Sequence, residues 1–242
     1  LLIAQKRFDE AGKQLQLALQ TREKILAADH PLIADSLHRL GRLQAAQGKP
    51  EEAIASFQRA LAINEKNFGV SHEKLLPDLN ALLASQRTLK KLPAVEALQI
   101  RIVTLQEQRL GPSHPEVMAL IADLADTEEA QAKLAEAEAL QRRILAYREK
   151  TFGVEHVRVA ESLYTVATLN QKMRQAKAAE SYYLRAQATW EKTVGPAHHT
   201  IAAVQLALGD LRREAGKPAE AEPFYQRALT IWETSTPESS NV

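Results

Sequence analysis

Histidine recurs along this chain at a fixed interval. The recurring residues are His30, His72, His114, His156 and His198, each 42 residues after the one before. Six glutamates keep the same step: Glu23, Glu65, Glu107, Glu149, Glu191 and Glu233. An interval kept without insertion or deletion indicates a repeat architecture, in which one small unit of structure stacks on the next.

One cycle of the repeat reads as two helices. Apolar residues in 31–47 recur every three or four positions, which predicts an amphipathic helix, termed helix A, that begins at Pro31. Gly48 can adopt the left-handed conformation that ends a helix, and Pro50 can open the next one. A second apolar stripe, helix B, then runs to Gly69. Each cycle is therefore helix A, a tight turn, helix B and a short loop.

Small and large residues occupy fixed positions within the cycle. Helix B carries a small–aromatic–small set in three cycles: Ala53, Phe57 and Ala60; Ala179, Tyr183 and Ala186; Ala221, Tyr225 and Ala228. A small residue allows two helices to approach to about 8–10 Å, and the aromatic ring fills the space beside it. The second and third cycles depart from this set: Val95, Gln99 and Ile102; Ala137, Gln141 and Ile144. We expect the array to bend or loosen there.

The repeat resembles the tetratricopeptide repeat. The resemblance rests on L-x-x-L-G-x-x-Q at 37–44, on A-x-x-x-F-x-x-A at 53–60, and on their later copies. The 42-residue length, "REK" near the end of helix B and "LGPSHPEV" at 110–117 are similar to the kinesin-light-chain type of this repeat. The resemblance implies an all-α fold, a right-handed superhelical solenoid of antiparallel helix pairs, with about five full repeats after a partial one.

We expect a single solenoid over residues 1–234. Its units are a partial repeat at 1–30 and repeats at 31–72, 73–114, 115–156, 157–198 and 199–234, followed by a flexible polar tail at 235–242. Leu1 to Gln5 align with the end of a helix A, and no polar capping helix is evident after Trp232. Because repeat arrays need capped ends, we expect a fragment of a longer array, or a chain whose ends pack on something else.

Charge and composition argue against several functions. The 31 basic and 30 acidic side chains leave a net charge of +1, so we expect no nucleic-acid partner. There is no cysteine, which removes thiolate chemistry and leaves the compartment open, with the cytoplasm favoured and the periplasm compatible. No apolar run approaches the roughly 18 residues of a membrane span, so we expect a soluble protein. No nucleophile, phosphate-loop or metalloprotease motif occurs, so we expect no enzyme, no cofactor and no catalytic residue.

The recurring histidines and glutamates are interpreted as structural. Equivalent histidines of neighbouring repeats are separated by two packed helices, more than about 10 Å, whereas zinc needs its nitrogen ligands about 2.0–2.1 Å away. We therefore expect no metal site, and expect each histidine to hydrogen-bond a free backbone group at the start of helix A or the preceding helix B. Each glutamate opposes the dipole near the end of helix B. It should have a partner: a neighbouring lysine or arginine, the histidine, or a free N–H of the following helix A.

The remaining candidate site is the inner face of the A helices. The resemblance implies that these helices line a concave groove. Their non-core residues are His38, Arg42, Asn80, Arg87, Asp126, Tyr164, Thr168, Asp210 and Arg213. We expect this polar face to bind a peptide or protein segment through hydrogen bonds and a few side-chain pockets.

The resemblance also indicates where this groove differs from relatives. Kinesin-light-chain-type grooves hold the peptide backbone with asparagines, and Asn80 is the one match in this sequence. The equivalent positions hold His38, Ala122, Tyr164 and Leu206. Chaperone-binding tetratricopeptide domains use a carboxylate clamp of paired lysine and asparagine, and Arg42 stands where an asparagine is expected. Neither class of ligand carries over.

The sequence favours a non-enzymatic interaction scaffold that holds a protein or peptide partner in the groove. Two alternatives remain open. The first is a structural assembly module that forms a homo-oligomer through its terminal repeats, Leu1–Ile3 at one end and the helix at 221–232 at the other. The second is a regulatory or sensor array within a larger multidomain protein.

Overall fold

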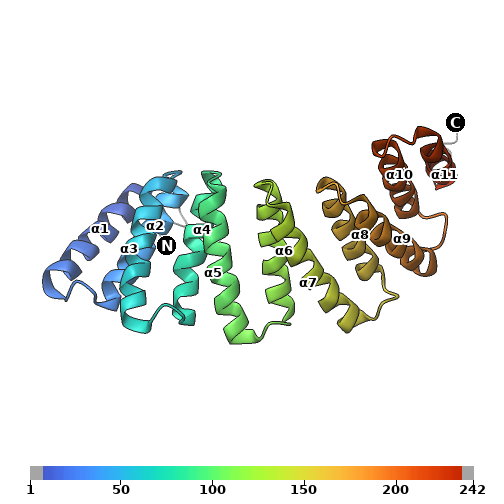
Figure 1. The fold of residues 1–242 in the computed structure, drawn as a ribbon. Helices are drawn as coiled ribbons and strands as arrows, with labels where there is room; N and C mark the ends of the chain where they lie inside the picture. The colour runs from blue at the N-terminus through green and yellow to red at the C-terminus, as the bar shows by residue number, and fades with distance from the viewer. Residues whose placement is uncertain (1–7, 236–242) are drawn as a thin grey trace, which may run out of the picture. The chain divides into compact units, whose positions relative to one another are not determined.

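The computed structural model describes residues 8–235, and all regular structure within this range is helical (Figure 1). The elements are α1 (Phe8–Ile25), α2 (Pro31–Ala46), α3 (Pro50–Phe68), η1 (Glu73–Leu75), α4 (Leu76–Thr88), α5 (Leu92–Leu110), α6 (Pro115–Ala130), α7 (Leu134–Phe152), α8 (Val157–Lys172), α9 (Ala176–Thr193), α10 (His199–Glu214) and α11 (Pro218–Ser235). Even-numbered helices are the predicted A helices, and odd-numbered helices are the predicted B helices. The expectation of an all-α helical repeat is confirmed.

The second cycle begins differently from the first. Helix α2 starts at Pro31, as predicted, whereas the matching segment of the second cycle first forms the 3₁₀ turn Glu73–Leu75. The reason is Pro77, which has no N–H to donate to the carbonyl of Glu73 and whose ring would clash with that carbonyl. The α-helix therefore starts at Leu76, which places Pro77 in its first turn.

The tight turn between helix A and helix B uses one left-handed residue per cycle. These residues are Gly48 (φ 75°), Lys90 (53°), Ala132 (59°), Arg174 (59°) and Gly216 (75°). The backbone N–H of Gly48 donates to the carbonyl of Ala45, and the next N–H, of Lys49, donates to that of Gln44. This is the arrangement that satisfies free carbonyl groups at the end of a helix. The predicted role of Gly48 is confirmed.

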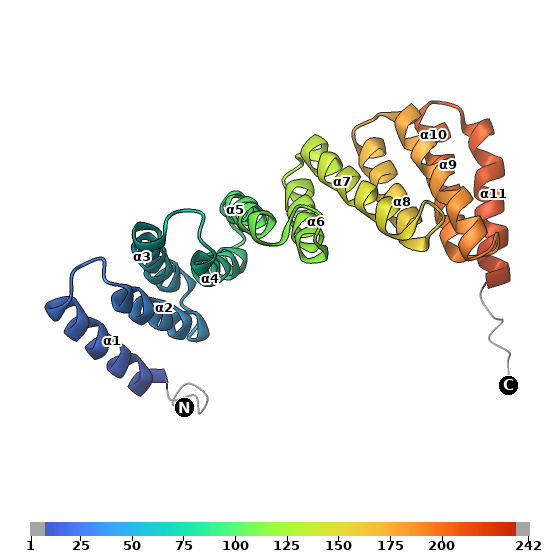
Figure 2. The ribbon, with the colours of Figure 1, turned by 90° about the horizontal axis from the view of Figure 1, so that it is seen from below.

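The contacts between helices divide the chain into two compact units, with the boundary between Leu120 and Ile121, inside α6. In unit 1, which ends at Leu120, α2 packs against α1, α3 and α4, and α4 packs against α3 and α5. Figure 2 shows the A helices α2 and α4 on one side of this unit and the B helices α3 and α5 on the other. The single array over 1–234 and the bend in its middle cycles stay predictions.

Unit 2 begins at Ile121 and repeats the same succession of helices. Helix α8 packs against α7 and α9, and α10 packs against α9 and α11. Its core joins residues from every one of these helices, including Leu163, Tyr183, Trp190 and Ile201. Burial of such side chains is the main driving force for folding, at about 25 cal/mol per Å² of apolar surface.

The small–aromatic pairing predicted from the sequence is confirmed where the sequence keeps it. A Cβ atom built on Gly41 of α2 would lie 2.7 Å from the ring of Phe57, and one on Gly209 of α10 would lie 2.5 Å from the ring of Tyr225. In the second cycle helix A instead carries Leu83, and the aromatic position of helix B holds a glutamine. The space that a ring fills elsewhere is there used by a larger residue of helix A.

Two expectations fall on parts of the chain that are not described. The alignment of Leu1 to Gln5 with the end of a helix A lies outside residues 8–235. The predicted tail at 235–242 is wrong at its first residue, because Ser235 is the last residue of α11; the rest of the tail also lies outside residues 8–235.

Candidate ligand groove on the A helices

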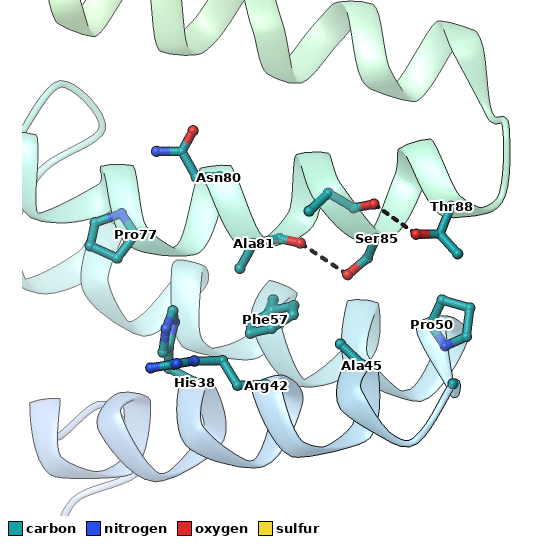
Figure 3. A pocket seen from close by; sticks show the side chains of 12 residues that line it. His38, Arg42, Ala45, Pro50, Phe57, Pro77, Asn80, Ala81, Ser85 and Thr88 are labelled. Carbon is teal, nitrogen blue, oxygen red and sulfur yellow. Dashed lines mark hydrogen bonds between the residues drawn. The ribbon is translucent and has the colours of Figure 1, made fainter. Parts of the chain in front are cut away.

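All nine predicted site residues lie on A helices, and three of them meet in one groove. This unit 1 groove has a volume of about 700 Å³ (Figure 3). It is lined by His38, Arg42, Ala45, Gly48, Pro50, Phe57, Pro77, Asn80, Ala81, Ala84, Ser85 and Thr88. The predicted residues among them are His38 and Arg42 of α2 and Asn80 of α4. Arg87, also on α4, does not line the groove.

Small side chains on two neighbouring A helices open this groove. Ala45 of α2 and Ala81 and Ala84 of α4 line it where larger residues would fill the space between the helices. Phe57 of α3 is 1 % exposed and contributes apolar surface from below. A concave site that is mostly apolar and has a few polar groups is typical of ligand binding.

A buried carboxylate lies behind the groove. Asp78 of α4 is 2 % exposed, and its Oδ1 is 2.6 Å from Nδ1 of His38. Its Oδ2 accepts a hydrogen bond of 2.7 Å from Nδ2 of Asn64 in α3. Figure 3 shows the His38 ring projecting from α2 toward α4, and this ring lies 5.4 Å from that of Phe57. Both oxygens of Asp78 are thus satisfied, as a buried carboxylate requires.

The polar groups of the unit 1 groove differ in whether they already have hydrogen-bond partners within the protein. The hydroxyls of Ser85 and Thr88 donate to the carbonyls of Ala81 and Ala84, as the dashed lines of Figure 3 mark. The guanidinium of Arg42 and the carboxamide of Asn80 are exposed, and neither has a polar partner among residues 8–235. These two groups are available to a ligand.

In unit 2 the predicted residues of α8 belong to a packed aromatic cluster. The ring of Tyr164 is half-buried, 5.3 Å from the ring of Tyr183 and 5.7 Å from that of Trp190. Burial, and to a smaller extent the Asp210 carboxylate, raises the pKa of the Tyr164 phenol. Thr168 donates to the carbonyl of Tyr164 and lies 3.3 Å from the Tyr183 hydroxyl.

The predicted residues of α10 bind one another. Arg213 Nη2 donates to Asp210 Oδ1 at 3.1 Å, and the Tyr225 hydroxyl donates to the same oxygen at 3.0 Å. The hydrogen bond to Tyr225, then that to Asp210, raises the pKa of the Arg213 guanidinium. Asp126 of α6 is exposed as a residue, but partial burial of its carboxyl group raises the pKa. The negative charges of Asp123 and Glu129 raise it further. A separate cavity of about 460 Å³ between α8 and α10 includes none of the nine residues.

The recurring histidines each cap the start of a repeat: His72 caps the 3₁₀ turn before α4, and the other four precede an A helix directly. The Nδ1 atom accepts a hydrogen bond from the backbone N–H two residues later, at 3.1–3.4 Å. The residues are His30, His72, His114, His156 and His198. The predicted hydrogen bond to a free backbone group is confirmed. Phe68 and Phe152, at the ends of α3 and α7, also pack on the rings of His72 and His156.

The recurring glutamates form a ladder along the B helices. Glu23 pairs with Arg59 at 2.8 Å, and Glu65 pairs with Arg101. The later pairs are Glu149–Arg185 at 2.8 Å and Glu191–Arg227 at 2.9 Å. The prediction of a partner is confirmed for these four, and in each the partner lies on the next B helix, 36 residues on. The sequence carries a signal for these pairs: the four arginines recur at the same 42-residue interval as the glutamates.

These features define the class of protein: an all-α chain of helical hairpins stacked within each unit, with capped A helices. One tetratricopeptide repeat family model matches residues 1–66 and 158–234, and a second matches residues 117–158. The chain belongs to the tetratricopeptide repeat family. A comparison with curated proteins finds no match.

Solved structures share the fold. Nearly identical TPR-like repeats of a Podosopora anserina protein assigned as a kinesin light chain are 24 % identical, with a TM-score of 0.60, over 86 % of this chain and 99 % of that chain. BtubC (BKLC) from P. vanneervenii is 15 % identical, with a TM-score of 0.55, over 97 % and 96 %. MamA is 13 % identical, with a TM-score of 0.53, over 86 % and 97 %. The repeats are therefore of the kinesin-light-chain-like type in fold.

Proteins built from this repeat are typically non-enzymatic scaffolds for protein interaction. Within residues 8–235, no helix combines the length and apolar character that crossing a membrane requires.

Proposed function

We propose that this chain is a non-enzymatic interaction scaffold that holds a peptide or protein segment against its A helices, with the unit 1 groove as the principal contact. The observation that carries the proposal is the presence of two polar side chains, Arg42 and Asn80, that have no partner within residues 8–235 and lie beside an apolar floor. In the kinesin-light-chain-type grooves that the repeats resemble, asparagine at the position of Asn80 holds a peptide backbone.

The chemistry of the groove suits a peptide in an extended conformation. Such a segment advances about 3.3 Å per residue and presents N–H and C=O groups along both edges. The Arg42 guanidinium can donate to a carbonyl, and the Asn80 carboxamide can both donate and accept. One small apolar side chain of the ligand would be buried against Phe57, which favours binding through the hydrophobic effect.

The predicted residues of unit 2 are proposed as a secondary contact. These are Asp126, Tyr164, Thr168, Asp210 and Arg213. Asp210, Arg213 and Tyr225 already satisfy one another, so a ligand would have to replace internal hydrogen bonds and would gain less than at unpaired groups. Arg87 of α4 extends the polar face of unit 1 beyond the groove.

Selection from a displayed random-peptide library tests the proposal. We expect peptides selected on the wild-type chain to lose at least tenfold in affinity with Arg42→Glu and severalfold with Asn80→Ala. The matched control is Arg39→Glu, the same change on the same helix at a residue that is 64 % exposed in its side chain and does not line the groove. Peptides that bind all three variants as tightly as wild type would place the ligand elsewhere.

One observation favours assembly as a second function. Leu229 of α11 is 54 % exposed, whereas Leu61, which occupies the same position in the first full repeat, is 8 % exposed. Trp232 of the same helix is 39 % exposed. We propose that this face can also pack on another molecule of the chain. Light scattering at rising concentration should then show a dimer that Leu229→Glu dissociates; a monomer throughout would count against assembly.

A further inference from the structure

We infer that His38 is a ligand-binding residue of the unit 1 groove: Asp78 fixes its ring so that Nε2 accepts an N–H of the bound peptide, and binding therefore weakens on acidification. This inference rests on the proposed function of the groove and goes beyond it, because it names what the ligand presents and how pH controls the contact. The resemblance places His38 where kinesin-light-chain-type grooves carry an asparagine; the tautomer set by Asp78 and the dependence on pH belong to the histidine of this chain.

The orientation of the ring follows from its buried partner. The Asp78 carboxylate accepts from Asn64 at one oxygen and lies 2.6 Å from Nδ1 of His38 at the other. A carboxylate only accepts hydrogen bonds, so the neutral ring must carry its proton on Nδ1. The lone pair of a neutral imidazole is then on Nε2. Asp78 thus acts as a positioning residue that sets the tautomer of His38.

The free edge of the ring faces the space that a ligand would occupy. The His38 side chain is 23 % exposed and lines the groove, while Asp78 beneath it is 3 % exposed in its side chain. In the part of the chain that the structure describes, Nε2 has no hydrogen-bond partner. The groove therefore offers one acceptor at His38, donors at Arg42, and both at Asn80.

That combination matches one occupant better than others. An extended peptide unit presents an N–H and a C=O, which His38 and Arg42 complement, and Asn80 can bond either group of the next unit. A ligand carboxylate would complement Arg42 but would face a lone pair at His38, which is repulsive. We therefore commit to a segment read through its backbone, with an uncharged small side chain over Phe57.

Acidification reverses the role of Nε2. Protonation of the ring places a hydrogen on Nε2, and this N–H then opposes the ligand N–H. The charged groups facing the ring are the Asp78 carboxylate from α4 and Arg42 beside it on α2; Asn64 and Phe57 from α3 are uncharged. Loss of one hydrogen bond and the new repulsion predict a fivefold to tenfold weaker affinity, on the order of one hydrogen bond.

The test uses peptides selected on the wild-type chain at about pH 8 that contain no Asp, Glu or His, so that only the protein titrates. Fluorescence anisotropy gives Kd at about pH 8 and pH 5.5 for wild type and for His38→Gln, whose amide can accept but does not titrate. We expect the wild-type affinity to fall fivefold to tenfold and that of His38→Gln to change less than twofold. Because all other histidines remain in the variant, their effects cancel.

A second variant tests the role of Asp78. Leu occupies the matching position of the next cycle, at Leu120, so Asp78→Leu suits the repeat. We expect it to weaken binding twofold to threefold at about pH 8 and to abolish the single Nδ1–H tautomer that nitrogen NMR should detect in the wild type.

The outcomes separate the two proposals. Selected peptides that ignore Arg42→Glu and Asn80→Ala would overturn the groove itself, and the inference with it. Peptides that need both residues, yet bind equally at the two pH values or lose affinity equally in His38→Gln, would overturn the role of His38 alone. Selection of only acidic peptides whose affinity rises on acidification would do the same.

Discussion

Phe57 of α3 lies against the backbone of Gly41 in α2, so closely that a Cβ atom at position 41 would be 2.7 Å from the ring carbon Cε1. The ring itself is 1 % exposed and cannot swing away without leaving the core of unit 1. The absence of a side chain at one residue therefore sets how closely helix A and helix B of this repeat approach.

Gly41→Ala should destabilise the chain by about 1–3 kcal/mol, because the added methyl group overpacks a filled contact. The matched control is Gly12→Ala in α1, where the nearest atom to a new Cβ would be 3.4 Å away, on Leu43. There the gain in helix propensity, up to about 1 kcal/mol, should dominate. Urea denaturation of both variants measures the difference. Equal effects would show that the ring does not limit the approach of the helices.

Arg174→Gly should stabilise unit 2 by about 1 kcal/mol, since a non-glycine residue in the left-handed region carries a steric penalty that glycine avoids. Arg174 is exposed at φ 59°, and the same turn position is Gly216 one cycle later. The reverse change, Gly216→Ala, should destabilise by a similar amount. Arg174→Ala controls for loss of the side chain and should change the midpoint of thermal unfolding little.

His156→Ala should cost about 0.5–2 kcal/mol, the usual range for loss of a helix N-cap. His156→Asn keeps an acceptor for the Arg158 N–H and should recover most of that loss. The part of the unfolding free energy that His156→Asn does not recover measures the packing of the His156 ring on Phe152. The centroids of these two rings are 4.8 Å apart. Chemical denaturation of the two variants decides; equal losses would mean that the capping hydrogen bond contributes little.

Tyr183 should make the protein sensitive to alkali. Burial raises the pKa of its phenol to about 12, above the usual value for tyrosine. The unfolded chain therefore releases this proton first, so the stabilising effect is complete below about pH 10 and is lost as pH rises toward 12. Tyr183→Phe should flatten the fall in unfolding free energy across that window. An unchanged alkaline profile in this variant would assign the loss to other groups.

The sequence predicts the helices well because many of their boundaries carry proline, glycine or histidine; α9, which follows Gln175 and is followed by Val194, carries none of these. Proline opens α2 and α3, glycine follows α3, α5 and α7, and histidine precedes each helix A. The repeat pattern alone does not predict the 3₁₀ turn before α4, because Pro77 has no proline counterpart in the other cycles. The effect of proline on the carbonyl four residues earlier is local and could have been predicted.

The candidate site was predicted less completely. The repeat places nine residues on A helices, but which of them share a groove depends on the size of their neighbours, such as Ala81 and Ala84. Asp78 was missed because its matching positions in the repeat hold serine, leucine or valine. A carboxylate at a buried position is the signal that would have found it, since such a group requires donors from other helices.

The Glu–Arg ladder limits the insertions and deletions that this chain can accept without losing the ion pairs. In each pair the arginine lies 36 residues after the glutamate, and both residues recur every 42. If residues 157–198 were excised, Glu149 would be followed at the same separation by Arg227, and the pairing would be restored. An excision of another length between Glu149 and Arg227 would not bring these two residues to the same separation. Whole-cycle gain or loss is therefore the change in length that the ladder tolerates.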